Sequence, residues 1–314
     1  MRHATLISEI GSRPWALQIE WLQAMTVALQ QLAEGKTSRF GAEVAGRFSA
    51  GRPREAFGSA GDVAIVPVMG IITQRGSAFD ELFGGGSVAA EPLTAVIRQL
   101  GADESIKGIV LDIDSPGGTV GGLGELGDAI YSLRGVKPVV AIANALCASA
   151  AYWIGSAAEQ FVVSPEGQAG SIGVWAAHVD TSGLMEKMGV KYTLVSAGKY
   201  KTEGNPYAPL DESARAHLQA QVDDYHGMFV RAVARNRKDT QIAVREGYGQ
   251  GRVLNARDAV RAKLADRVAP LSQVVEELRG RGTLARQRAG VFAGLSAGRP
   301  RLEAARRRLL IETA

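Results

Sequence analysis

The chain has 314 residues, of which 46% are hydrophobic and 22% charged, an ordinary globular composition with room for one large domain or two small ones. The net charge is +4, but the tail from Arg279 onward carries +7 and leaves −3 for the rest, which argues against a nucleic-acid-binding core. The single cysteine, Cys147, excludes an intrachain disulfide and a cysteine-rich metal site.

The beginning of the chain, MRHATLISE, is polar and is followed by no long apolar region, so no targeting signal is predicted. The sequence contains no uninterrupted apolar run of about 18 residues, so we expect no membrane span. A cytoplasmic protein is therefore expected.

Residues 1–60 are predicted to form a helical accessory segment and a linker. Apolar residues from Leu17 to Leu32 follow the spacing of one helical face, and a Gly/Arg/Ser/Pro stretch follows at 46–55. Trp15 and Trp21 are interpreted as packing anchors.

A regular alternation of strands and helices begins near Asp62 and predicts a second domain at 61–278. The expected strands are 63–72, 108–114, 138–142, 161–163 and 191–195, and the expected helices are 91–100, 123–133 and 210–237, followed by a short α/β element at 251–268. Pro67 places the first strand at a sheet edge or bulge. This order predicts an α/β fold with right-handed crossovers. Residues 279–314 are predicted to be a basic, mobile tail.

Ser149 is the candidate nucleophile. It lies among small residues between an expected strand and an expected helix, where a tight turn can present a hydroxyl. Cys147, two residues earlier, is interpreted as a small buried apolar residue.

The turn Asp114-Ser-Pro-Gly-Gly118 follows the buried strand 108–114. Consecutive glycines let the backbone approach a substrate carbonyl, and their N–H groups can stabilise an oxyanion. The N–H of Ala150, directly after Ser149, is the expected second donor.

The choice of general base stays open at this point. Of the four histidines, His3 is terminal, His217 and His226 fall on the long helix, and His178 has no partner acid that can be named. A Ser-His-Asp triad is therefore unsupported. Lys199 and Lys201 follow strand 191–195, and a lysine buried among apolar groups can act as a base.

Four segments in this order resemble the signal peptide peptidase A family of serine peptidases, and most closely its soluble, single-repeat branch, similar to phage prohead proteases. They are Asp114-Ser-Pro-Gly-Gly118, Ala148-Ser-Ala-Ala-Tyr-Trp153, Gly170-Ser-Ile-Gly-Val174 and Ala197-Gly-Lys-Tyr-Lys-Thr-Glu-Gly-Asn-Pro206. Gly251-Arg-Val253 and Leu264-Ala-Asp266 resemble the family's closing element, so the likeness covers about residues 62–270.

The resemblance implies a ClpP/crotonase-like spiral of ββα units and a homo-oligomer. It assigns the nucleophile to Ser149, the general base to Lys201, and the hydroxyl that orients the lysine to Ser171. The oxyanion donors fall on Gly118 and Ala150, and no metal or cofactor is required.

Two positions depart from the family pattern. Ala150-Ala151 stands where many relatives have Gly-Gly, and Lys263 stands where a glycine is usual.

The sequence thus predicts a serine endopeptidase that acts on protein or peptide substrates in phage head maturation or cytoplasmic peptide degradation. A role in phage heads would make it prohead-associated, with the basic tail as a contact for nucleic acid, capsid or scaffold. Two alternatives remain: a crotonase-like acyl-CoA hydratase or isomerase using Asp112 and Asp114, and a catalytically silent assembly module.

Overall fold

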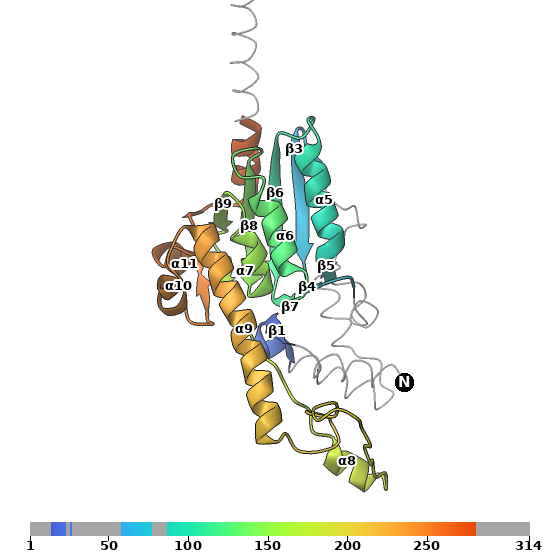
Figure 1. Cartoon of the computed structure of the whole chain (residues 1–314). Coiled ribbons are helices and arrows are strands. Elements are labelled where there is room, and N and C mark those ends of the chain that lie inside the picture. The colour runs from blue at the N-terminus through green and yellow to red at the C-terminus, as the bar shows by residue number, and fades with distance from the viewer. Residues whose placement is uncertain (1–13, 23–25, 27–57, 77–86, 281–314) are drawn as a thin grey trace, which may run out of the picture.

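The computed structural model describes residues 14–22, 26, 58–76 and 87–280 (Figure 1). The predicted linker at 46–55, the helical positions Met25, Leu29 and Leu32, and the basic tail from 281 onward lie outside the described residues.

The described strands form two sheets. The larger has the order β11-β10-β8-β6-β3-β2, with β9 against β8 and β12 against β9. Its strands are β2 (Gly58–Ala60), β3 (Val63–Met69), β6 (Gly108–Ser115), β8 (Val139–Ala148), β9 (Gln160–Val163), β10 (Gln168–Gly170), β11 (Val253–Asn255) and β12 (Arg267–Val268). The smaller sheet has the order β1-β7-β4-β5, with β1 (Trp15–Leu17), β4 (Ile71–Thr73), β5 (Ser87–Ala89) and β7 (Gly117–Thr119).

The described helices that flank these sheets are α5 (Ala90–Ala102), α6 (Leu123–Tyr131), α7 (Ala150–Gly155), α8 (Ser182–Lys187), α9 (Glu212–Arg237), α10 (Gln241–Gly247) and α11 (Ala256–Arg261). The chain repeats a unit in which a strand of the larger sheet is followed by a strand of the smaller sheet and then by a helix. One unit is β6-β7-α6, and the other is β3-β4-α5, in which β5 is inserted before the helix. The predicted α/β fold built from ββα units is therefore confirmed.

Both faces of the larger sheet are covered, which explains why its central strands are apolar without alternation. Helices α5, α6 and α7 lie along one face (Figure 1) and bury the main core. On the other face, Val274, Val275 and Leu278 from the helical residues 271–280 pack against Val63 and Val110.

Most elements lie where the sequence predicts them, with boundaries shifted by a few residues. The long helix begins after Asp211, whose carboxylate accepts the N–H of Ala214 as an N-cap. Pro67 lies in β3 beyond the stretch that β2 covers, so its missing N–H falls on a sheet edge that no described strand covers, as predicted. Lys263, at the usual glycine position, has φ of +63°, so the local turn keeps the conformation that a glycine would adopt.

Two predictions are corrected: the start of the N-terminal helix, whose described residues 19–22 and 26 are helical, and the strand at 191–195. Leu17 belongs to strand β1 and not to a helix, and the helical residues begin at Ile19. The predicted strand at 191–195 has no regular structure, because no neighbouring strand within the described chain pairs with it, and Val195 is 93% exposed.

Residues 176–210, which include α8, form an extension that we call the arm. It lies beyond the N-terminal end of α9 and away from the two sheets (Figure 1). The structure describes every residue of the arm, and none of them is buried.

Candidate active site

Ser149 occupies a strained turn between the end of β8 and the start of α7. Its φ of +56° and ψ of −116° lie outside the conformations that a non-glycine residue normally adopts, and its side chain is buried. Strain of this kind persists where the surroundings enforce it, and a sharp strand-to-helix turn is a known way of presenting a nucleophilic serine.

Three hydrogen bonds hold this turn. The N–H of Ser149 donates to the carbonyl oxygen of Gly170 at 2.8 Å, and the carbonyl oxygen of Ser149 accepts the N–H of Trp153 at 3.0 Å. The Ser149 hydroxyl donates to the carbonyl oxygen of Gly173 at 3.3 Å. The two backbone hydrogen bonds fix the position of the residue. The hydrogen bond of the hydroxyl is long, so the hydroxyl can leave Gly173 and donate to a catalytic base instead.

The glycine strand β7 lies directly against this turn. A Cβ added to Gly117 would lie 2.9 Å from the Cβ of Ser149, and one added to Gly118 would lie 1.8 Å from the carbonyl oxygen of Ile72. The absence of side chains therefore lets the backbone of β7 approach Ser149. On the other side, the N–H of Ala150 belongs to the first turn of α7, where N–H groups have no acceptor within the helix.

Ser171 lies at the same edge of the sheet as Ser149. Strands β8 and β10 are parallel and pair Ala148 with Gly170, so the two serines are the next residues along each strand. Ser171 also has a positive φ, +55°, and its N–H donates to the carbonyl oxygen of Arg252 at 2.8 Å. The closing element, which contains Arg252, thus holds the second turn in place.

Lys201 lies apart from this group within one copy of the chain. It is exposed on the arm, in the segment between α8 and α9 that Figure 1 shows away from the two sheets, whereas Ser149 directly precedes α7 at the end of β8. Its neighbour Lys199 lies over the ring of Tyr200, 4.8 Å from the ring centroid. The structure therefore brings together Ser149, Ser171, Ala150 and the glycines, and leaves the lysines outside.

The histidines that the structure describes contact other elements. His178 lies 3.1 Å from the carbonyl oxygen of Asn205 in the arm, and His217 contacts Gln221 on α9. Burial, aided by the charge of Arg245, lowers the pKa of His226. None of these contacts involves the serine turn.

The carboxylates of the crotonase-like alternative both lie on β6. The parallel pairing with β3 places Asp112 opposite Pro67 and Asp114 opposite Met69. Both carboxylates lie on the one strand that precedes the glycine turn. They therefore do not face each other from two sides of a pocket, as a pair of catalytic carboxylates would.

Cys147 is buried in the core, as predicted, and burial raises the pKa of its thiol well above the ordinary value. A buried, protonated thiol is a poor nucleophile. Ser149 is therefore the better candidate of the two.

The sequence did not reveal two contributors to the site, strand β1 and Trp175. The rings of Trp15 and Trp175 stack with centroids 6.1 Å apart, and the two residues form an isolated antiparallel bridge. Trp15 is thus the packing anchor that its aromatic side chain predicted. A pairing between residues 160 positions apart leaves no signal in local periodicity.

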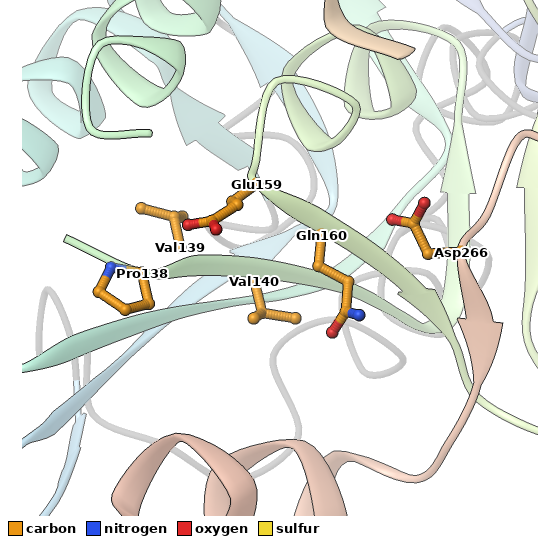
Figure 2. Close-up of a pocket in the computed structure, with 6 residues that line it drawn as sticks. All are labelled: Pro138, Val139, Val140, Glu159, Gln160 and Asp266. Atoms are coloured by element: carbon orange, nitrogen blue, oxygen red, sulfur yellow. The ribbon is translucent and has the colours of Figure 1, made fainter. Parts of the chain in front are cut away.

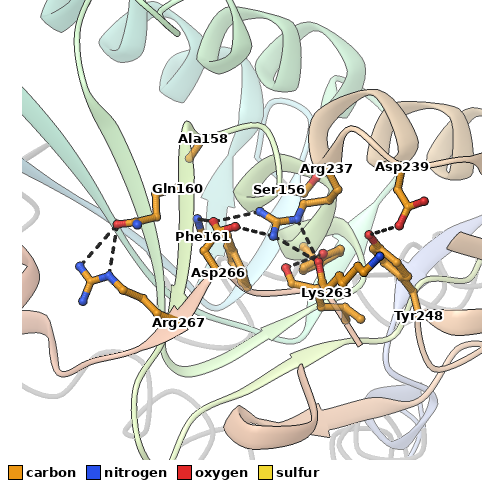
Figure 3. A network of polar contacts seen from close by, with 12 residues as sticks. Ser156, Ala158, Gln160, Phe161, Arg237, Asp239, Tyr248, Lys263, Asp266 and Arg267 are labelled. Carbon is orange, nitrogen blue, oxygen red and sulfur yellow. Dashed lines mark hydrogen bonds and ion pairs between the residues drawn. The ribbon is translucent and has the colours of Figure 1, made fainter. Parts of the chain in front are cut away.

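A surface pocket lies at the opposite end of β8 from Ser149. Figure 2 shows its lining, which includes Val139 and Val140 at the start of β8 and Gln160 at the start of β9. Asp266, also in this lining, belongs to an ion-pair network with Arg237 (Figure 3). The pocket therefore does not contribute to the serine site.

Within the described parts of the chain, no group of three or more His, Cys, Asp or Glu side chains is arranged to hold a metal ion. Over the same residues, no helix combines the length and the hydrophobicity needed to cross a bilayer.

Comparison with known proteins gives consistent matches. Residues 132–284 match the model of peptidase family S49. Capsid assembly protease C of Escherichia phage lambda is 33% identical over 218 residues, 69% of this chain and 48% of that protein. A candidate protease of Synechocystis, slr0021, is 30% identical and is covered over 75% of its length, with 69% of this chain aligned. A candidate signal peptide peptidase SppA of Enterococcus faecium is 25% identical over 68% of this chain and 61% of that protein.

The chain spans about half the length of the phage relative. The matched region contains the Ser149 turn, both ends of α9 and the closing element, and it includes three of the four segments that carry the predicted resemblance; Asp114-Ser-Pro-Gly-Gly118 precedes it. The chain belongs to peptidase family S49.

Proposed function

We propose that this protein is a serine endopeptidase that hydrolyses peptide bonds through an acyl-enzyme on Ser149. The observation that carries the proposal is the strained Ser149 turn, set between the glycine strand β7 and the first turn of α7. The S49 relatives, among them a phage capsid assembly protease, support the same activity.

In the proposed reaction, the Ser149 Oγ attacks a substrate carbonyl and gives its proton to a neutral amine. The N–H groups of Gly118 and Ala150 stabilise the oxyanion, and each such donor contributes about 100- to 1000-fold to the rate. The amine then protonates the leaving group, and water hydrolyses the acyl-enzyme by the same route. Ser171, next to Ser149 at the sheet edge, orients the amine.

We assign the amine to Lys201 of a second copy of the chain. A lysine becomes a base when burial removes its charge, and Lys201 is exposed within one copy. The arm that carries it also exposes large apolar side chains: Leu184, Met188, Val190, Tyr192, Leu194, Val195 and Tyr200. Such a cluster is expected at a protein–protein contact, and packing the arm on a neighbouring copy would bury these side chains and the lysine together.

Complementation tests both parts of this proposal. Ser149→Ala and Lys201→Ala are each expected to lower peptide cleavage by at least about 1000-fold. Mixing the two inactive variants, after dissociation and reassembly, is expected to restore activity, because some sites then combine an intact serine with an intact lysine. Lys199→Ala is the matched control and should retain cleavage.

Full activity in Ser149→Ala would refute the nucleophile. Inactive mixtures would refute the supply of Lys201 by a second copy and leave the nucleophile standing.

The proposed substrates are proteins, and the similarity to the lambda capsid assembly protease favours a role in phage head maturation over general peptide degradation. Cleavage of co-expressed head proteins, followed by mass spectrometry, tests this role. Contact of the basic tail with nucleic acid or capsid is a separate proposal, tested by salt-dependent retention with and without residues 279–314.

A further inference from the structure

Strand β1 pairs antiparallel with the glycine strand β7, which lies against the Ser149 turn; Figure 1 labels both strands. The paired residues are Trp15 with Thr119, Ala16 with Gly118, and Leu17 with Gly117. The N–H of Gln18 donates to the carbonyl oxygen of Pro116 at 3.1 Å, which makes that pair a hydrogen-bonded one. Because such pairs alternate along an antiparallel ladder, Ala16 and Gly118 form the next one, in which the Gly118 N–H faces the Ala16 carbonyl.

The carbonyl oxygen of Ala16 also lies close to the candidate nucleophile. A Cβ added to Gly117 would lie 2.3 Å from the Ala16 carbonyl oxygen and 2.9 Å from the Cβ of Ser149, so both groups border the same point. Ala16 itself is fully buried. Its carbonyl therefore has the surroundings that a scissile carbonyl requires, with a serine on one side and an oxyanion donor facing it.

The other edge of β1 is held by Trp175. The N–H of Trp15 donates to the carbonyl oxygen of Trp175 at 2.7 Å, and the N–H of Trp175 donates back to Trp15 at 2.9 Å. The indole Nε1–H of Trp175 donates to the carbonyl oxygen of Leu17 at 2.6 Å. An extended segment bonded along both edges is how a groove between strands binds a peptide.

We propose that residues 15–17 occupy the peptide-substrate groove of their own chain, exclude other substrates from it, and present the Ala16–Leu17 bond to Ser149 for self-cleavage. This inference rests on the proposed peptidase function. It goes further by naming a substrate segment within the chain. It also implies that this segment blocks the active site until cleavage releases it.

The reaction is a hydrolysis. The Ser149 Oγ forms a bond to the Ala16 carbonyl carbon and its proton passes to the base; the C–N bond to Leu17 breaks, and the leaving amine takes that proton. Water then attacks the ester, which frees the Ala16 carboxylate and restores the serine hydroxyl. The products are a chain that begins at Leu17 and the segment that precedes it.

The experiment compares self-cleavage with access to the site in the full chain. Purified wild type and Ser149→Ala are incubated, and N-terminal sequencing looks for chains that begin at Leu17. In parallel, a fluorophosphonate probe measures how fast Ser149 is labelled in uncleaved protein. Ala16→Asp places a charge in the buried pairing position, and Ile19→Asp, at a residue 52% exposed just after β1, is the matched control.

We expect Leu17 chains from wild type and none from Ser149→Ala, together with labelling at least tenfold faster in Ala16→Asp than in wild type or Ile19→Asp. Equal labelling rates without any Leu17 chain would overturn the inference and leave the peptidase proposal intact. Failure of every variant to be labelled or to cleave peptides would overturn both. The sequencing arm uses unaltered protein, so it decides the question even where Ala16→Asp fails to fold.

Discussion

The hydrogen bond from the N–H of Ser149 to the carbonyl oxygen of Gly170, at 2.8 Å, joins the two turns of the candidate site. It continues the parallel pairing of β8 with β10 by one step and holds Ser149 beside Ser171, both with positive φ. Two strained residues at one sheet edge indicate that the fold enforces their geometry. The backbone of a single copy therefore fixes the positions of the two serines, and this holds without a lysine in the site.

The close approach of β7 predicts a different outcome for two glycine variants. In Gly118→Ala the new methyl would lie 1.8 Å from the Ile72 carbonyl oxygen, so the sheet must shift, and we expect a loss of about 2 kcal/mol or more of unfolding free energy. In Gly124→Ala on α6, nothing lies within 4 Å of the new methyl, and helix propensity should add about 0.5–1 kcal/mol. Chemical denaturation of both variants measures the contrast. Equal stability would show that β7 has room for a side chain.

The burial of Cys147 predicts that its thiol is inert in the folded protein. Burial raises the pKa of this thiol, so the reactive thiolate is scarce at pH 8, and the side chain is also out of reach of a reagent. We expect no alkylation by iodoacetamide until the protein is unfolded. Val195→Cys, at an exposed position of the arm, should be alkylated at once in the same chain. Rapid modification of Cys147 in the native protein would contradict its place in the core.

The elements that the sequence predicted well are those whose signal is local. The apolar run of β6, the glycine turn after it and the long helix α9 each have a signal that lies within the segment itself. The Ser149 turn was also predictable, because a strand that leads directly into a helix needs a tight turn, and small residues around the serine leave room for one. Strand β1 was missed since its partners, β7 and Trp175, are about 100 and 160 positions away.

The strand predicted at 191–195 failed for a related reason. Its apolar side chains match a strand's composition, but among the described residues of one copy no strand pairs with this segment, and its side chains are exposed. If residues of the arm are buried in an oligomer, their hydrophobicity reports a contact between copies, and a single copy cannot show it.

Removing one apolar side chain from the arm should therefore affect assembly rather than folding. Val195→Asp is expected to lower the oligomeric state and the peptidase activity together, with the melting temperature of the isolated chain unchanged, because the side chain is 93% exposed. Ile242→Asp is the control. It replaces an apolar, exposed residue on α10, outside the arm, and should leave assembly intact. Sedimentation analysis and peptide cleavage give the two readouts. Unchanged assembly in Val195→Asp would exclude this part of the arm from the interface.

The ion pair of Arg237 with Asp266 predicts a loss of stability in acid. The carboxylate accepts two Arg237 hydrogen bonds, at 2.7 and 3.1 Å, and the N–H of Phe161 at 2.7 Å, which ties the end of α9 to β9 (Figure 3). Burial acts to raise the pKa of Asp266, but the hydrogen bonds and charge of Arg237 outweigh it and hold the pKa below its ordinary value of 3.8.

Because the pKa is lowered on folding, the stabilisation is present above the ordinary aspartate pKa and is lost as the pH falls through the folded value. Asp266→Asn is expected to lower the unfolding free energy by about 2 kcal/mol at pH 7, with the difference from wild type shrinking below about pH 4. Asp128→Asn, which breaks an exposed pair with Arg235, should cost only a few tenths of that amount at either pH. Urea unfolding of the three proteins between pH 7 and pH 3 measures these differences. A constant gap between Asp266→Asn and wild type over this range would show that the carboxylate charge is not what Arg237 stabilises.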